Sequence, residues 1–158
     1  MTEETGGWDL EVRPRRVKYV AYAAALVIVV VHVTVGALLK LSATGVIFQT
    51  SDQVAMGVLG VLLAGAVLLF TRPRLRVGPD GLAVRNVLSD KVIAWSEIVG
   101  VSFPVGARWA RVDLPDDEYV PMMAIQSVDK GLAVDAMDRV RELVAQYRPD
   151  LSAPSTTS

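Results

Sequence analysis

Few side chains in this chain of 158 residues could carry out chemistry. Cysteine is absent, which excludes disulfides, thiolate metal sites and thiol nucleophiles together. His32 is the only histidine and lies near the middle of an apolar run, two residues from Thr34, where an ionisable group is a functional candidate by default. A single histidine without a second titratable group makes no proton path. The alternative is a neutral imidazole that hydrogen-bonds across a helix pair.

Three adjacent acids, Asp116, Asp117 and Glu118, could bind a cation through their carboxylates. Three acids in a hairpin turn are more often simply solvated, and most other acids of this part of the chain also fall in turns. The sequence contains neither a phosphate-cradling glycine loop nor a metal-spaced cluster. We therefore expect no catalytic residues, no metal and no cofactor, and we expect the protein not to be an enzyme.

Basic residues gather in two short clusters on either side of a long apolar stretch, and we expect them to contact the membrane surface. They are Arg13, Arg15, Arg16 and Lys18 in the first cluster, and Arg72, Arg74 and Arg76 in the second. The remainder of the chain is balanced, with 11 basic and 12 acidic residues from Arg72 onward and a formal net charge of -1 overall. Without a domain-wide basic field, nucleic acid is not an expected partner.

The stretch between the two clusters contains two charge-free apolar segments. Tyr19–Leu39 has 21 residues, and a helix rising ~1.5 Å per residue then covers roughly the 30 Å of a bilayer core. Val54–Phe70 has 17 residues, and its polar neighbours could extend the helix at headgroup level. We predict a transmembrane hairpin over 19–70. A cleaved signal peptide is the alternative for the first segment, but its apolar run is too long.

The positions of the bases predict how this hairpin is oriented. Four bases precede the first helix, Lys40 is the only base of the connecting loop, and three follow the second helix. Because short loops rich in Lys and Arg stay in the cytoplasm, we expect both termini inside the plasma (inner) membrane and the loop Leu41–Gln53 outside. The alternative is that the bases only solubilise the helix flanks.

Small residues four positions apart could form the contact between the two helices, because they allow close backbone approach in a membrane. Ala21 and Ala25 have this spacing in the first helix, and Gly60 and Ala64 have it in the second. Such spacing is also common by chance. The sequence therefore leaves undecided which faces of the two helices meet.

The chain outside the hairpin is organised around short strands. Met1–Glu11 is polar and acidic and Leu151–Ser158 is rich in Ser, Thr and Pro, so we expect both to be disordered, the former within a cytoplasmic segment over 1–18. Over 71–150, alternating segments separated by turns such as Gly78–Gly81 indicate an antiparallel sheet. Apolar residues spaced three and four apart then predict a helix from Gly131 to Tyr147, with Asp129 as its N-cap.

These elements predict an α+β fold in which a curled sheet of six or seven strands is capped by a C-terminal helix. Three stretches, Gly81–Leu88, Val92–Ile98 and Arg108–Val112, resemble the bacterial PH-domain family of actinobacterial membrane proteins. The resemblance covers roughly 75–128, and members of that family often carry a preceding pair of membrane helices. It implies the pleckstrin-homology (PH) fold. PH domains that hold phosphoinositides use bases around the first strand-to-strand loop, which we assign to Gly78–Gly81.

Four aromatic side chains are expected to belong to the core of this domain: Trp95, Phe103, Trp109 and Tyr147. Trp95 ends one predicted strand and Trp109 begins another, so each ring could lie under the curled sheet while its indole N–H finds a carbonyl. The alternative for the two tryptophans is a shelf for a ligand.

These observations lead to two functional hypotheses. The first is a membrane-anchored binding module or scaffold that presents a protein-interaction surface at the cytoplasmic face of the membrane. The second is a peripheral sensor of anionic lipid headgroups that uses the juxtamembrane arginines. The expected partners are the lipid bilayer and a membrane or cytoplasmic protein, with a second copy of this chain as one candidate.

Overall fold

The structure, a computed structural model, describes residues 7–41 and 49–152. The chain forms two compact units. The hairpin unit is Val17–Thr71, and the sheet domain combines the segment that ends at Arg16 with the chain from Arg72 onward. The hairpin is therefore an insertion within the sequence of one domain.

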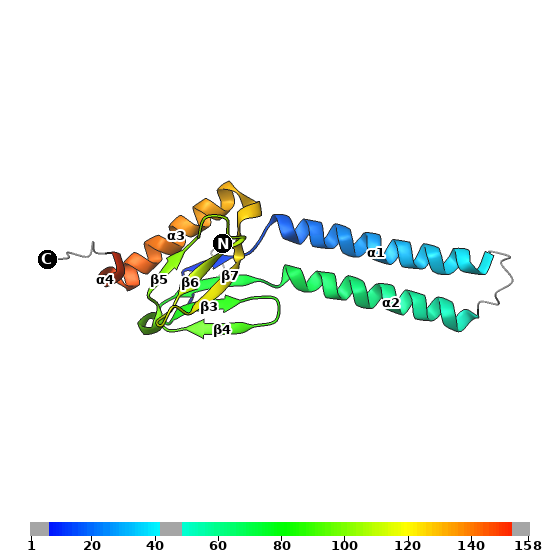
Figure 1. Cartoon of the computed structure of the whole chain (residues 1–158), viewed down its shortest axis with the longest axis horizontal. Coiled ribbons are helices and arrows are strands. Elements are labelled where there is room, and N and C mark those ends of the chain that lie inside the picture. The colour runs from blue at the N-terminus through cyan, green and yellow to red at the C-terminus, as the bar shows by residue number, and fades with distance from the viewer. Residues whose placement is uncertain (1–6, 42–48, 153–158) are drawn as a thin grey trace. The chain divides into compact units, whose positions relative to one another are not determined.

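The hairpin unit contains two long helices joined by a connection that includes residues 42–48, which lie outside the described part of the chain (Figure 1). Helix α1 spans Arg16–Leu41, and α2 spans Thr50–Leu68 before a 3-10 turn, η1, at Leu69–Thr71. Both helices begin before the charge-free segments of the sequence. Asp52 makes the early start of α2 possible, because its carboxylate accepts the backbone N–H of Gln49 at 2.8 Å and caps the first turn.

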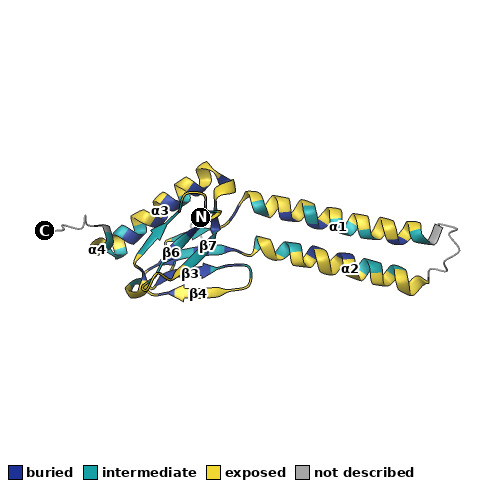
Figure 2. Cartoon of the chain, viewed as in Figure 1, coloured by how far each residue is buried: buried dark blue, intermediate teal, exposed yellow. Residues whose placement is uncertain are grey.

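Small residues line the face on which α1 and α2 meet, so the structure decides the alternative that the sequence left open. Ala21, Ala25, Gly60 and Ala64 are all buried. A Cβ atom added to Gly60 would lie 2.6 Å from Cβ of His32, so only glycine fits there without separating the helices. Most of the other apolar residues of both helices are exposed or only partly buried (Figure 2). Both helices are long and apolar enough to cross a membrane.

Four antiparallel strands form the first sheet of the sheet domain, in the order β1-β2-β3-β4. Strand β2 spans Arg74–Gly78, β3 spans Gly81–Arg85, and β4 spans Asp90–Ile93. Strand β1, Leu10–Val12, comes from the N-terminal segment and pairs with β2 in the register Leu10 to Val77 and Val12 to Leu75. The expectation of disorder is therefore wrong for Leu10 and Glu11, because both residues belong to β1 and pair with Val77 and Arg76 of β2.

The hairpin between β2 and β3 depends on a glycine. Gly78 pairs with Gly81 across a two-residue turn, and Gly81 has a φ of +132°. A Cβ atom at Gly81 would lie only 2.0 Å from the carbonyl oxygen of Ile93 in β4. Gly81 thus supplies both the backbone conformation and the space that bring three strands together.

Three further strands form a second sheet in the order β5-β6-β7. They span Gly100–Ser102, Trp109–Asp113 and Tyr119–Gln126. Two sheets of four and three strands replace the single curled sheet of the sequence prediction, because the 3-10 turn η2 at Trp95–Glu97 separates β4 from β5. Strand β7 is the longest of the three and ends at Gln126.

Helix α3, Gly131–Tyr147, completes the core of the sheet domain (Figure 1). Its buried residues, Ala133, Met137, Val140 and Val144, repeat at intervals of three and four and join one cluster with residues of both sheets. A short helix, α4 at Pro149–Ser152, follows, and Leu151 packs against that cluster. Disorder is therefore wrong for Leu151, whereas the tail over 153–158 lies outside the described residues.

The sequence predicts Asp129 as the N-cap of α3, and this prediction is wrong. Asp129 belongs to the 3-10 turn η3, Ser127–Asp129, and the residue that precedes α3 is Lys130, which has a φ of 50°. The Asp129 side chain is buried and accepts the backbone N–H of Arg16 at 3.0 Å. The carboxylate thus satisfies a donor in the first turn of α1 instead of one in α3.

Candidate binding surfaces of the sheet domain

The outward face of the first sheet carries a cluster of arginines around one carboxylate. Glu11 in β1 accepts from Arg13 at 2.6 Å and from Arg76 at 2.9 Å, and it lies 3.5 Å from a guanidinium nitrogen of Arg74. We call these four residues the Glu11 cluster. Three positive charges meet one negative charge, so the cluster has a formal charge of +2.

Strand pairing explains why these residues meet. Glu11 lies opposite Arg76 in the β1–β2 register, and side chains alternate along β2, so that Leu75 and Val77 enter the core while Arg74 and Arg76 face outward. Partial burial acts to raise the pKa of Glu11, but the hydrogen bonds from Arg13 and Arg76 and the charges of Arg13 and Arg74 together lower it below its ordinary value. Glu11 is therefore an ionised partner for the arginines at neutral pH.

The other bases predicted at the membrane surface do not join this cluster. Arg15, Arg16 and Arg72 are exposed. The ammonium of Lys18 lies 5.9 Å from the ring centre of Tyr22, one turn further along α1. Of the seven predicted residues, the structure thus brings together only Arg13, Arg74 and Arg76, and it adds Glu11, which sequence reasoning missed. The signal was the alternation of Leu10 and Val12 around it.

The identity of β1 also changes which loop joins the first two strands. The connection between β1 and β2 is not Gly78–Gly81, which joins β2 to β3, but the whole stretch from Arg13 to Pro73. Bases occur at both ends of that connection. The assignment of the first strand-to-strand loop to Gly78–Gly81 is therefore wrong.

The outward face of the second sheet is aromatic. Trp109 at the start of β6 is 37% exposed, and Tyr119 at the start of β7 is 57% exposed. The guanidinium of Arg111 lies 5.0 Å from the ring centre of Tyr119, and it donates to Asp113 at 2.7 Å and to Ser102 at 3.1 Å. The expectation that Trp109 is a core residue is wrong. Side chains alternate along β6, so that Trp109 lies on the outer face and the next residue, Ala110, is fully buried.

The other three predicted core aromatics are half-buried and do pack in the domain. Trp95 and Phe103 lie against the buried cluster. Trp95 stacks on Tyr147 with ring centres 4.9 Å apart and donates its indole N–H to the carbonyl of Gly78 at 3.0 Å. The Tyr147 hydroxyl donates to Asp9, which raises the pKa of Tyr147. Arg148 completes the arrangement by donating to the carbonyls of Trp95 and Ile98.

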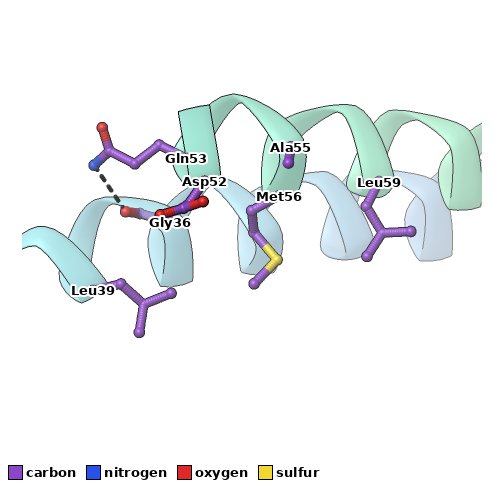
Figure 3. A pocket seen from close by; sticks show the side chains of 7 residues that line it. All are labelled: Gly36, Leu39, Asp52, Gln53, Ala55, Met56 and Leu59. Carbon is purple, nitrogen blue, oxygen red and sulfur yellow. Dashed lines mark hydrogen bonds between the residues drawn. The ribbon is translucent and has the colours of Figure 1, made fainter. Parts of the chain in front are cut away.

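The polar residues of the hairpin unit serve its own packing. His32 donates from Nδ1 to the carbonyl of Ile28 at 2.7 Å, one turn earlier in α1. Gln53 donates to the carbonyl of Gly36 at 3.0 Å, which links α2 to α1 (Figure 3). Gly36 and Gln53 also line a groove with Leu39, Asp52, Ala55, Met56 and Leu59. These contacts agree with a structural histidine, although His32 hydrogen-bonds within its own helix and not across the helix pair as expected.

The acidic turn joins β6 to β7. Asp116 and Asp117 have φ values of 58° and 59°, as the two central residues of a type I′ hairpin turn require. The backbone N–H of Leu114 donates to the carbonyl of Glu118 at 2.8 Å and closes the hairpin. Among residues 7–41 and 49–152, no group of three or more acidic, histidine or cysteine side chains is placed to hold a metal ion. The three acidic residues are exposed.

Comparison with known proteins agrees with this architecture, a two-sheet domain with a C-terminal helix. Residues 72–143 match the family model described as a bacterial PH domain. Uncharacterised proteins of Mycobacterium bovis and Mycobacterium tuberculosis are 63% identical over 153 residues, which covers 97% of this chain and 99% of each relative. No solved structure matches. The chain is therefore a member of the bacterial PH-domain family, with relatives in mycobacteria. PH domains are generally non-catalytic binding modules.

Proposed function

We propose that this chain is a membrane-anchored binding module that presents a protein-interaction surface at the cytoplasmic face of the plasma membrane. The observation that carries the proposal is the insertion of the apolar hairpin between two paired strands, β1 and β2. Three residues separate the end of β1 from α1, and two separate the end of η1 from β2. Both ends of the hairpin are thus short tethers to one domain.

The properties of the hairpin unit support membrane insertion. Its exposed valine and leucine side chains would be costly in water, and lipid would cover them. The bases before α1 and after α2 favour cytoplasmic termini and an external loop under the positive-inside rule. The sheet domain then faces the cytoplasm.

The family and the second sheet favour a binding role over an enzymatic one. PH domains generally bind lipids or proteins, and the exposed Trp109 and Tyr119 are residue types enriched at protein interfaces. We propose a protein partner in the membrane or cytoplasm, or a second copy of this chain, and no cofactor or nucleic acid.

Topology provides the first test of this proposal. A reporter fused after Ser158 should be active only in the cytoplasm, and a tag at Thr44 should be accessible only from outside. A tag at each site is the control for the other, because the proposal requires opposite results in the same cells. A C-terminus outside the cytoplasm would overturn the proposed function.

The Glu11 cluster favours a second function, the sensing of anionic lipid headgroups. Its charge of +2 is attached to strands that lead directly into the hairpin, and each base near an anionic leaflet contributes about 1 kcal/mol. Arg74 and Arg76 already share Glu11, so part of this attraction is satisfied internally. That sharing is why we rank lipid sensing second.

Docking of the sheet domain on lipid, measured with the full-length chain in nanodiscs, tests whether the arginines are a non-specific anchor or a lipid site. Because the chain has no cysteine, Ala83→Cys gives a single labelling site on β3, opposite Arg76. A spin label there should report the same docking on all anionic lipids of equal charge density, weakened by salt, if the arginines are a non-specific anchor. A preference for one headgroup that is lost in Arg72→Gln/Arg74→Gln/Arg76→Gln would identify a lipid site. The control variant Arg108→Gln/Lys130→Gln/Arg139→Gln removes the same charge from exposed positions elsewhere and should keep that preference.

A further inference from the structure

We propose that the outer face of the β6–β7 hairpin, together with its acidic turn, binds a lysine- and arginine-rich segment next to the membrane helix of a partner protein. This inference rests on the proposed function, because it requires the sheet domain to face the cytoplasm. It specifies where on the domain the partner binds and which chemistry the partner presents.

The aromatic part of this surface is exposed to solvent. Trp109 and Tyr119 are exposed, and neither belongs to the packed cluster that includes the buried residues of both sheets and α3. Their rings are apolar platforms with negative π faces, which attract the ammonium of lysine and the guanidinium of arginine. Arg111 already lies against the Tyr119 ring in this way, which shows that the ring accepts a cation in this setting.

The formal charge of this surface determines which charge a complementary partner carries. The span Trp109–Gln126 contains one base and four acids, which gives a formal charge of -3. Arg111 pairs with Asp113 at 2.7 Å, whereas none of the ion pairs within the described residues involves Asp116, Asp117 or Glu118. Three unpaired carboxylates therefore lie next to Tyr119 in the chain. A cationic segment complements both the rings and the acids.

The proposed location of the domain determines which cationic segment is available. Cytoplasmic flanks of membrane helices are enriched in Lys and Arg. The short connections at both ends of the hairpin keep the sheet domain close to the leaflet, where such flanks occur. The bilayer itself is a poor occupant of this surface, because its cytoplasmic leaflet is anionic and repels the acidic turn.

Binding of a defined peptide to the full-length chain in zwitterionic nanodiscs tests the proposal. The probe is a fluorescent peptide in which Lys and Arg alternate with Leu, and the comparison peptide has Glu at every basic position. We expect the basic peptide to bind at low salt and the acidic peptide not to bind. Asp116→Asn/Asp117→Asn should weaken binding about fivefold, since each exposed ion pair contributes up to about 1 kcal/mol and Asn tolerates the left-handed turn.

Two matched variants distinguish this surface from general charge attraction. Asp135→Asn/Glu142→Gln removes the same charge from exposed positions of α3 and should leave the affinity unchanged. Trp109→Leu/Tyr119→Leu keeps apolar cover but removes the rings, and it should weaken binding about tenfold while thermal unfolding confirms that the domain is folded.

Several results would overturn the proposal. These are absence of binding by the basic peptide, equal binding by the acidic peptide, an equal effect of the α3 control, or no effect of the ring variant. A spin label at Glu118→Cys that contacts lipid would identify the membrane as the occupant. Failure of these assays with the expected topology refutes only this surface, whereas an inverted topology refutes the proposed function even if the peptide binds.

Discussion

Asn86 joins the two sheets, and we expect its replacement to be one of the most costly single changes in the domain. Its side chain is 6% exposed and follows β3 in the first sheet. The amide nitrogen donates to the carbonyl of Pro121 at 2.8 Å, and the amide oxygen accepts the backbone N–H of Met123 at 3.1 Å. Both backbone groups belong to β7, an edge strand of the second sheet. The side chain therefore replaces a missing neighbouring strand.

The expected magnitude follows from those two bonds. Asn86→Ala leaves one donor and one acceptor of β7 without a partner, and each unsatisfied buried group costs about 1 to 3 kcal/mol. Pro121 and Met123 are half-buried and water can reach them in part, so the lower end applies and the sum is about 2 to 3 kcal/mol. That loss is a large fraction of the stability of a small domain and lowers its melting temperature by about 10 to 20 °C.

The assay is urea unfolding of the full-length chain in nanodiscs, followed by tryptophan fluorescence. Asn86→Leu is the informative control, because it restores the volume but not the hydrogen bonds and should remain destabilised. Ser89→Ala changes an exposed neighbour and keeps the carbonyl that accepts the Asn86 backbone N–H at 2.8 Å, so it should be neutral. A loss below about 0.5 kcal/mol for Asn86→Ala, or recovery by leucine, would refute the hydrogen-bond argument.

Three further predictions concern the hairpin, the Glu11 cluster and the aromatic stack. Cysteines at Gly36 and Met56 should form a disulfide, since their Cβ positions are 3.8 Å apart, and Gly60→Val should slow its formation while exposed Gly65→Val does not. Because the pKa of Glu11 is lowered, its contribution to stability is present above about pH 4.5 and lost as pH falls through the folded pKa, so Glu11→Gln should flatten an acid unfolding series. Tyr147→Phe should remove the stability loss that follows ionisation of its hydroxyl above about pH 10, measured by alkaline unfolding.

Local patterns in the sequence were enough to predict the large elements. A helix or strand that buries one face must repeat its apolar residues with the period of that element, so α3 is evident from the spacing of Ala133, Met137, Val140 and Val144. The apolar segments of the hairpin and their basic flanks are equally local signals. The four-residue spacing of Gly60 and Ala64 was not enough to predict the helix contact, because such spacing is also common by chance.

The tertiary structure alone decided which distant segments pair. A strand of three residues carries little periodic information, and its stability comes from a partner, so β1 could not be recognised before β2 was placed beside it. That pairing brings Glu11 to Arg76 across 65 residues of sequence. The role of Asp129 likewise depends on the nearness of Arg16, which lies 113 residues earlier in the sequence. These features are set by contacts between segments far apart in the chain, which no local pattern encodes.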